Sequence, residues 1–504
     1  MKAPGAMSPR VLSWLAATFV SGATVMALEM VAVRLFAPYF GYSVYVWGTT
    51  IGVVMTAMVA GYAVGGRLAA RTVAASGGHH RGRVAGEHVF FAILAGAAWQ
   101  ALALLTMPFI LPPLAEMGEV VGVALGALVL FAPAMVALAA TGPVTVRLCA
   151  DVLPIGVASG LVSALSTAGS IAGIMGTIFG LLPKVGTETT LHVLCVATFL
   201  TAAAGLVLVP RHRRLGLPVA AAPAAMLLLV PGLGWAQGTV WTSESAYNLV
   251  RVVQIGGQRM LQLNHPSSIH TVREGHGTWT GFYYDYFALG PLLVPTKRAL
   301  VLGMGAGGSI QSMRRTAPEV EIDAVEIDPR VVEAASRFFD VDVSSDPRLR
   351  VHVMDARRFL GRDRGTYDLV QLDVFQGGPY VPFHLVTEEC FRLARARMSD
   401  DALLMMNVFD RSADSAVLHR LAATLRRVFP SVMAGRTEAG NFMLFAFTRV
   451  PSANRLAFHS PVLPSTGGVQ KLALSEVPVT DGAPVFTDDL APIEEMTRRM
   501  LAAR

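Results

Sequence analysis

Long apolar stretches fill the first 236 residues of this chain, and they constrain its fold more than any other feature. A stretch of about 20 apolar residues can cross a bilayer as a helix. The sequence offers seven candidates, at about 11–37, 44–66, 87–112, 119–142, 155–182, 189–209 and 215–235. They predict a transmembrane helical domain over residues 1–236 with six or seven spans, a multi-pass integral location in the inner or plasma membrane, and the lipid bilayer as a partner.

The distribution of charge supports this division. Only 15% of the residues are charged, against about 25% in an average soluble protein. The first 236 residues hold 12 Lys/Arg and 6 Asp/Glu, and the remainder holds 29 of each. The net charge of +6 therefore belongs to the helical half, where it indicates topology rather than phosphate binding, and nucleic acid is not expected as a partner.

The orientation of the helices follows from their basic residues. If the first six spans alternate, ten Lys/Arg fall on one side and Lys184 falls on the other, which predicts that the first side is cytoplasmic. A seventh span at 215–235 would then export everything after it. That stretch contains three prolines, so a re-entrant or interfacial segment is the alternative, and we favour a cytoplasmic C-terminal domain.

Other features of the helical half allow two readings each. The segment GYAVGGRLAAR at 61–71 resembles the loop between helices 2 and 3 of major facilitator transporters. Glu29 and Arg34 lie within the first apolar stretch and have either a structural or a functional role there. A recurrence of small residues predicts close helix packing rather than a transport pathway; these residues are Gly169, Ser170, Gly173, Gly176 and Gly180.

The second half has the pattern of a soluble α/β protein. Residues 247–255 and 259–264 alternate around Gly256-Gly257, which predicts a β-hairpin within a subdomain at 240–290. From 291 to 504, strands alternate with helices, including a helix at about 308–316 and one that begins at Pro329. This order predicts a parallel-rich sheet with helices on both faces. The three cysteines are far apart, so neither a disulfide framework nor a metal site is expected.

Candidate site residues follow the strands of this sheet. The turn after the first strand contains Gly303, Gly305 and Gly307, which allow the backbone to approach a ligand. Three carboxylates end the next strands. Glu326 is placed to accept the hydroxyls of a ribose, Asp355 can reach an adenine amino group, and Asp373 faces the same crevice. The arrangement predicts a nucleoside site, and it favours a sulfonium cofactor over NAD.

This half resembles the spermidine synthase (polyamine aminopropyltransferase) family over most of its length. The matching segments are Ser245-Ala-Tyr247, Tyr283-Tyr-Asp285, GMGAGG at 303–308, EID at 326–328, DA at 355–356 and YDLVQLD at 367–373. The whole chain resembles the membrane-bound branch of that family, as does the segment at 487–494. The resemblance implies a Rossmann-like, class I methyltransferase-like fold, with decarboxylated S-adenosylmethionine as the donor.

The resemblance also implies roles for individual residues. Asp373 would be the catalytic base that deprotonates the attacking amine. The cofactor site would comprise Gly303, Gly305, Gly307, Glu326, Asp328, Asp355 and Ala356, and the substrate site Tyr247, Tyr283, Asp285 and Gln376. The sequence departs from the family at Ala306, Gln376 and Ser268, where acids or an amide are usual. The nucleoside site is therefore better preserved than the polyamine site.

Three functions are consistent with these observations. The first is aminopropyl transfer to a small amine, with release of methylthioadenosine. The second is a transferase or cyclase that uses intact S-adenosylmethionine on another substrate, such as a lipid. The third is a non-catalytic transporter or sensor regulated by a nucleoside, which the presence of Asp373 disfavours. A homo-oligomer is compatible with all three.

Overall fold

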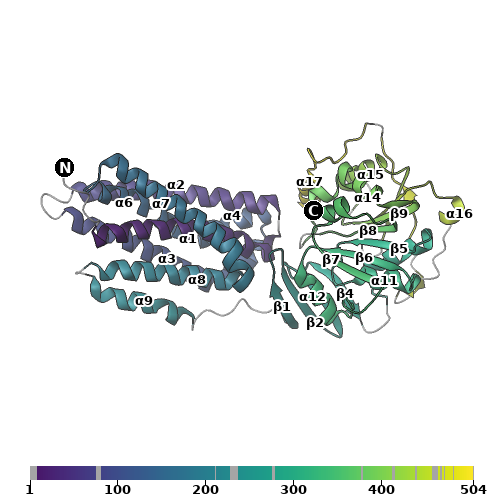
Figure 1. The fold of residues 1–504 in the computed structure, drawn as a ribbon, viewed down its shortest axis with the longest axis horizontal. Helices are drawn as coiled ribbons and strands as arrows, with labels where there is room; N and C mark the ends of the chain where they lie inside the picture. Colours follow the sequence, from purple (N-terminus) through teal and green to yellow (C-terminus); the bar gives the residue numbers. More distant parts are fainter. Residues whose placement is uncertain are drawn as a thin grey trace. The chain divides into compact units, whose positions relative to one another are not determined.

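The computed structural model describes residues 8–502 apart from 42, 75–80, 210–211, 228–236, 275–278, 376–377, 411, 413–414, 438–439, 457–463, 466–467, 470–471 and 481. The chain divides into two compact units, Met1–Trp235 and Ala236–Arg504. The first is helical and the second is an α/β unit, and Figure 1 draws both. Each unit is described by itself.

The helical unit is built around its first helix. Helix α1 (Pro9–Phe40) has buried side chains along its whole length and lies among the other helices of the unit (Figure 1). The helices that follow are α2 (Val44–Ala74), α3 (Arg81–Ala115), α4 (Glu119–Leu130), α5 (Ala132–Ala139), α6 (Thr141–Cys149), α7 (Ile155–Met175), the π-helical turn η1 (Gly176–Leu181), α8 (Leu182–Val207) and α9 (Arg213–Leu227).

Five helical stretches among the described residues are long and apolar enough to cross a membrane. They are Pro9–Phe40, Val44–Arg71, Gly86–Ala115, Ala132–Cys149 and Ile155–Val207. The last contains a break at Gly186, whose φ of 78° is not helical, and this break lies between the predicted spans 155–182 and 189–209. Of the predicted stretch 215–235, the structure describes the 15-residue helix α9 and nothing beyond Leu227.

The predicted span 119–142 differs from the observed helices. The helix is interrupted at Phe131 and again at Ala140, and it continues to Cys149. Pro133 lacks the N–H that would bond to the carbonyl of Val129 four residues earlier. The indole Nε1 of Trp99 donates to that carbonyl instead, at 3.0 Å. The freed backbone group is thus satisfied by a side chain from α3.

The predicted close packing at small residues is confirmed at Gly169 and Gly173 but not at Gly176 and Gly180, where an added Cβ would meet nothing within 4 Å. A Cβ added to Gly169 would lie 2.1 Å from the carbonyl oxygen of Phe19, and one added to Gly173 would lie 2.1 Å from that of Ala23. Both contacts are with the backbone of α1, so these two positions accept only glycine while the helices keep this distance.

The α/β unit begins with a four-stranded antiparallel sheet. Its strands β1 (Thr239–Glu244), β2 (Leu249–Ile255), β3 (Gln258–Leu263) and β4 (Ile269–Glu274) pair in sequence order. Gly256 and Gly257 connect β2 to β3 with φ values of 57° and 86°, which type I′ hairpin turns require. The expected hairpin is therefore present and has a strand on each side.

The larger sheet has eight strands in the order β14-β10-β11-β9-β8-β5-β6-β7. Strands β5 (Arg298–Leu302), β6 (Glu321–Glu326), β7 (Leu349–Val353), β8 (Tyr367–Leu372) and β9 (Met398–Val408) are parallel. Strands β11 (Phe442–Phe447), β10 (Ser431–Arg436) and β14 (Ser475–Glu476) continue the sheet with antiparallel pairing. A parallel sheet that reverses order at its first strand, with an antiparallel end, is the Rossmann-like arrangement predicted from the sequence.

Helices cover both faces of this sheet and form two hydrophobic cores (Figure 1). The 3₁₀ helix η2 (Tyr283–Leu289) and helices α10 (Gly290–Leu293), α11 (Gly308–Thr316) and α12 (Pro329–Phe338) contribute to one core. Helices α13 (Ala356–Arg362), α14 (Glu388–Arg395), α15 (Ala416–Arg426) and α17 (Ile493–Ala502) contribute to the other. The remaining elements are η3 (Phe383–Leu385), α16 (Ala453–Leu456), β12 (Pro464–Ser465) and β13 (Gly468–Val469).

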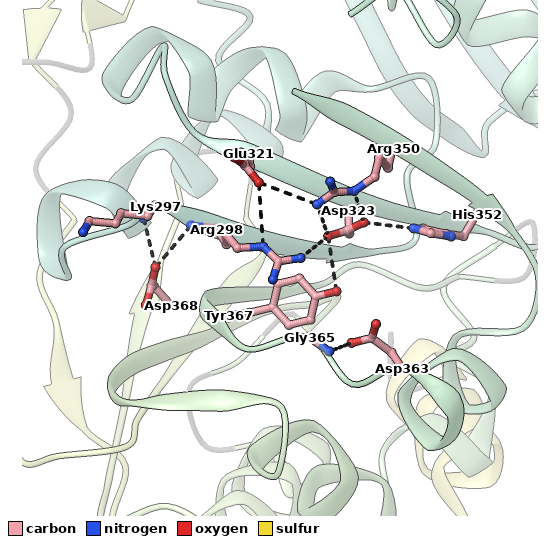
Figure 2. A network of polar contacts seen from close by, with 10 residues as sticks. All are labelled: Lys297, Arg298, Glu321, Asp323, Arg350, His352, Asp363, Gly365, Tyr367 and Asp368. Atoms are coloured by element: carbon pink, nitrogen blue, oxygen red, sulfur yellow. Dashed lines mark hydrogen bonds and ion pairs between the residues drawn. The ribbon is translucent and has the colours of Figure 1, made fainter. Parts of the chain in front are cut away.

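A polar network joins the strands near their amino ends, as Figure 2 shows. The carboxylate of Asp323 on β6 accepts hydrogen bonds from Arg298 at 3.0 Å, from Arg350 at 2.9 Å and from the Nε2 of His352 at 2.9 Å. The hydroxyl of Tyr367 donates to it at 3.3 Å. Burial acts to raise the pKa of Asp323, but the hydrogen bonds from Arg350 and His352 outweigh it and lower the pKa to about 2. Asp323 is thus ionised at neutral pH.

Candidate active site

The glycine turn between β5 and α11 has the conformation that its sequence requires. Gly303, Gly305 and Gly307 have φ values of 84°, 53° and 80°, where side chains with a Cβ are strained. A Cβ on Gly303 would lie 2.2 Å from the carbonyl oxygen of Asp373. The turn therefore lies directly against the end of β8. Its Ala306 is fully buried, and its N–H donates to the Oγ1 of Thr271 on β4 at 3.2 Å.

Glu326 closes the turn from the end of β6. Its Oε2 accepts from the backbone N–H of Gly305 at 3.1 Å, and its Oε1 accepts from that of Asp328 at 3.0 Å. Burial raises the pKa of Glu326 to about 7, although these backbone hydrogen bonds act against the shift. The carboxylate is thus fixed beside the glycine turn, where a ribose is expected to bind.

Asp328 has a structural position. Its side chain is fully buried and caps α12 by accepting from the N–H of Arg330 at 2.9 Å. Its second oxygen accepts from the hydroxyl of Ser245 at 2.7 Å and from the amide of Asn248 at 2.9 Å. These contacts connect the β1–β2 turn to the large sheet, and they occupy the carboxylate that the sequence offered as a cofactor contact.

Asp355 and Ala356 start the helix that follows β7. Asp355 caps α13 by accepting from the N–H of Arg358 at 2.8 Å. Its other oxygen lies 3.3 Å from the Nε2 of His384, and a third of the side chain is exposed. Ala356 is the first helical residue and is buried. The geometry leaves one edge of Asp355 accessible to a donor such as an adenine amino group.

Asp373 follows β8 and is held on both sides by neutral donors. Its Oδ1 accepts from the amide of Asn407 at 2.9 Å, and its Oδ2 accepts from the hydroxyl of Tyr283 at 3.1 Å. Burial raises the pKa of Asp373 to about 6, and the two hydrogen bonds limit the rise. A carboxylate with a pKa in this range can exchange a proton near neutral pH.

The other predicted substrate residues have different positions. Asp285 is buried and fixes the loop before η2, because its carboxylate accepts from the N–H groups of Thr280 and Gly281 at 2.7 and 2.8 Å and from the hydroxyl of Ser312 at 3.1 Å. Tyr247 lies in the β1–β2 turn with its side chain 45% exposed. Gln376 lies outside the described residues. Of the four candidates, the structure brings Tyr283 to Asp373.

Two asparagines near Asp373 were not found from the sequence. Asn407 lies at the carboxyl end of β9, and Asn441 precedes β11. The amide of Asn441 donates to the Oδ1 of Asn407 at 2.8 Å. A polar residue inside the apolar run LLMMNVF was the available signal for Asn407, whereas no local signal marked Asn441. The described residues contain no group of three or more His, Cys, Asp or Glu that could hold a metal ion.

Comparisons with known proteins find sequence similarity between this unit and enzymes named for polyamine synthesis. Residues 289–444 match the family described as the spermine/spermidine synthase domain. The chain is 32% identical over 192 residues to a polyamine aminopropyltransferase of Vibrio vulnificus, covering 36% of this chain and 62% of the relative. It is 25% identical over 197 residues to a probable polyamine aminopropyl transferase of Bifidobacterium longum, covering 39% of this chain and 43% of that relative.

A solved structure is also similar. It is a probable spermidine synthase from Corynebacterium glutamicum, with a TM-score of 0.38 and 18% identity over 48% of this chain and 92% of the other. The chain spans about half the length of the curated relatives it matches. The sequence similarities support a transferase, and they relate the α/β unit to the spermidine synthase family.

Proposed function

We propose that the α/β unit transfers an aminopropyl group from decarboxylated S-adenosylmethionine to a small amine and releases methylthioadenosine. The observation that carries this proposal is the position of Asp373. Its backbone carbonyl lies against Gly303 of the turn, and its carboxylate has a pKa raised to about 6 and accepts hydrogen bonds from Tyr283 and Asn407. A base at this point can take a proton from an amine that approaches the donor.

The residues around the turn fit the nucleoside part of such a donor. The glycines allow close backbone approach, Glu326 can accept from the ribose hydroxyls, and Asp355 can accept from the adenine amino group. Transfer forms a bond between the amine nitrogen and the aminopropyl carbon and breaks the carbon–sulfur bond, whose electron pair stays on sulfur. Asp373 receives the proton that the amine loses.

The acceptor is proposed to carry fewer positive charges than a typical polyamine substrate. Gln376 supplies no carboxylate where the resemblance leads us to expect an acid. A charge-assisted hydrogen bond to an ammonium contributes about 1.5–3 kcal/mol. An acceptor with one reactive amine would not need the missing contacts, whereas a polyamine would bind more weakly here than to an enzyme that retains them.

A product assay tests the proposal. The purified full chain is incubated with decarboxylated S-adenosylmethionine and a set of amines, and methylthioadenosine is measured. We expect its formation to require an amine. Turnover that is absent with every amine, in a protein that still binds the donor, would contradict aminopropyl transfer and favour the nucleoside-regulated sensor or transporter.

Methyl transfer from intact S-adenosylmethionine is the second candidate, and Ala306 is the observation that favours it. Without a carboxylate in the turn, the site has less to hold the ammonium of a decarboxylated donor. The same assay with intact S-adenosylmethionine separates the two reactions, because methyl transfer yields S-adenosylhomocysteine. A lipidic acceptor is tested by adding membrane extracts to this second reaction.

We further propose that the helical unit crosses the membrane and that the α/β unit is cytoplasmic. The length and apolarity of five helical stretches support the first part, and the excess of Lys/Arg on one predicted side supports the second. A C-terminal reporter that is active only in the cytoplasm tests the side. Activity of an export-dependent reporter instead would place the α/β unit outside.

A further inference from the structure

The contacts of Asp373 continue beyond its immediate neighbours. The Oδ1 of Asp373 accepts from Asn407, and the Oδ1 of Asn407 in turn accepts from the amide of Asn441 at 2.8 Å. Asn407 is 2% exposed and Asn441 is 9% exposed. The hydrogen bond between the two asparagines is therefore buried, and the one from Asn407 to Asp373 is partly buried. Burial strengthens such bonds and makes an unpaired amide costly.

This chain of bonds decides which way the amide of Asn407 faces. An asparagine side chain has one acceptor oxygen and one donor nitrogen. Because Asn441 donates to the oxygen, the nitrogen of Asn407 must point to Asp373. Rotating the amide would bring two donors together at Asn441 and two acceptors together at Asp373. Asn441 thus selects the orientation in which Asn407 stabilises an anion.

Asn441 is itself held by the β10–β11 hairpin. Its backbone carbonyl oxygen accepts from the backbone N–H of Thr437 at 2.8 Å and from the Thr437 hydroxyl at 3.0 Å. Strand β11 pairs with β9 so that Met443 lies opposite Asn407. The antiparallel end of the sheet thereby fixes the two asparagines at the edge of the parallel strands.

Among the described residues, the groups that contact Asp373 on its other sides are not charged. Tyr283 on η2 is the titratable residue whose contact with Asp373 the structure describes, and burial raises its pKa well above the usual value, so that it stays protonated. Gly303, in the turn after β5, lies against the backbone carbonyl of Asp373 and carries no charge. The charge state of Asp373 therefore depends chiefly on its burial and on the two donors, Tyr283 and Asn407.

We propose that Asn407 and Asn441 are positioning residues that keep Asp373 ionised and correctly oriented as the base of the reaction. Asn407 acts on the carboxylate directly, and Asn441 acts through Asn407. The proposal rests on the proposed function for its catalytic consequence. It goes beyond that function because it gives a role to the β10–β11 hairpin. Among the described residues, this hairpin has no hydrogen bond to the glycine turn or to Glu326.

The test compares the pH dependence of kcat/KM in full-length Asn407→Ala, Asn441→Ala and wild-type protein. Loss of the hydrogen bond from Asn407 disfavours the anion, so the acidic limb should move to higher pH by about one unit in Asn407→Ala and by about half a unit in Asn441→Ala. In the double variant the shift should be less than the sum, because both residues act in one chain. The KM for the donor should change little.

A spectroscopic measurement makes the test independent of turnover. Because Tyr283 donates to Asp373, protonation of Asp373 changes the ultraviolet absorbance of that tyrosine. The transition is followed between about pH 4 and pH 8 and assigned by its absence in Tyr283→Phe. Asn407→Ala and Asn441→Ala should move this transition in the same direction as the rate profile.

A matched control removes a different amide from the same unit. The Gln311 side chain donates to the carbonyl oxygen of Phe339 at 2.6 Å and has no described contact with Asp373. Gln311→Ala should lower the stability of the unit. It should not move the acidic limb of the kcat/KM profile or the absorbance transition of Tyr283. An unmoved transition in Asn441→Ala overturns the proposal. A wild-type protein with no turnover on any donor contradicts the proposed function instead, and the absorbance transition then decides the proposal by itself.

Discussion

An aspartate lies near the amino ends of the strands in the large sheet, and another lies at their carboxyl ends; the two have different neighbours. These two ends are called the amino edge and the carboxyl edge of the sheet. At the amino edge, Asp323 lies between Arg298, Arg350 and His352, and its pKa falls to about 2. At the carboxyl edge, Asp373 is held by the neutral donors Tyr283 and Asn407, and its pKa rises to about 6. Asp323 is buried, and Asp373 is half-buried. The charge of their hydrogen-bond donors decides whether each is a fixed anion or a group that can titrate.

This difference separates stability from chemistry within one fold. A fixed anion with cationic neighbours supports the folded state at neutral pH, whereas a buried carboxylate without them opposes it. The second arrangement persists where a proton must be exchanged. Ionised Asp373 at the carboxyl edge is therefore expected to lower the stability of the folded unit while it takes part in the reaction. Asp323 at the amino edge is expected to raise that stability and to have no part in the reaction.

The sharpest test of this contrast is Asp373→Asn. Loss of a general base should lower turnover by about 10²–10⁴-fold. Because burial raises the folded-state pKa of Asp373 to about 6, against about 3.9 when unfolded, its ionisation opposes folding increasingly as the pH rises from 4 to 6. Removing the charge should therefore stabilise the α/β unit at pH 7 by about 1–2 kcal/mol.

Both effects can be measured on one preparation, by product formation and by denaturant unfolding of the α/β transition. Donor affinity serves as the control and should stay near the wild-type value, because Asp373 is not assigned to the nucleoside. Normal turnover in Asp373→Asn would show that the base is a different group.

Glu326→Gln should separate binding from chemistry at the same edge. The carboxylate accepts two backbone N–H groups and is assigned to the ribose, so an amide at this position should weaken donor binding by about 10–100-fold with a smaller change in kcat. Since the pKa of Glu326 is raised to about 7, donor binding to wild-type protein should strengthen as the pH rises through 7. Donor titrations at several pH values would check this, and a loss confined to kcat would contradict the assignment.

Asp323→Asn addresses the amino edge. Removing this carboxylate leaves Arg298 and Arg350 without their main partner, and since both are partly exposed, the expected loss of stability is about 2 kcal/mol at pH 7. The folded-state pKa of about 2 lies below the unfolded value, so this stabilisation is complete above about pH 4 and is lost as the pH falls towards 2. Unfolding curves of the variant and wild type should therefore converge in acid. Turnover per folded molecule should be unchanged. A large loss of turnover would contradict the claim that Asp323 acts on stability alone.

Elements with local signals were predicted well from the sequence. Helix α11 occupies 308–316 as expected, and α12 begins at Pro329, because positive-φ glycines and a proline at the first helical position act over a few residues. Strand β10 was not predicted. Its sequence SVMAGR lacks a clear alternation, and it becomes a strand because β11 pairs with it.

The site was predicted in part for a related reason. The three carboxylates could be placed at strand ends from the order of elements alone. Their partners could not be, because Asn407 reaches Asp373 through the register of β8 against β9, which aligns Leu372 with Met406. Nor does the sequence distinguish a carboxylate that faces a ligand from one that holds backbone N–H groups, as Asp285 and Asp328 do.

The smallest expected effect concerns Gln371, two residues before Asp373 on the same face of β8. Its side chain is fully buried, and neither amide atom has a hydrogen-bond partner among the described residues. An unpaired buried amide costs about 1–3 kcal/mol, and methionine has a similar shape without that cost. Gln371→Met should therefore stabilise the unit by about 1 kcal/mol, and it would show that an unpaired amide close to Asp373 lowers the stability of the unit.

Denaturant unfolding measures this change, with Gln311→Met as the matched control. Gln311 does have a partner, the carbonyl of Phe339, so the same substitution there should destabilise the unit. If Gln371→Met destabilises as well, the Gln371 amide is satisfied by water in the folded protein. The Gln371 amide would then add nothing to the contrast between the two ends of the strands. That contrast would rest only on the charge of the groups around Asp323 and Asp373.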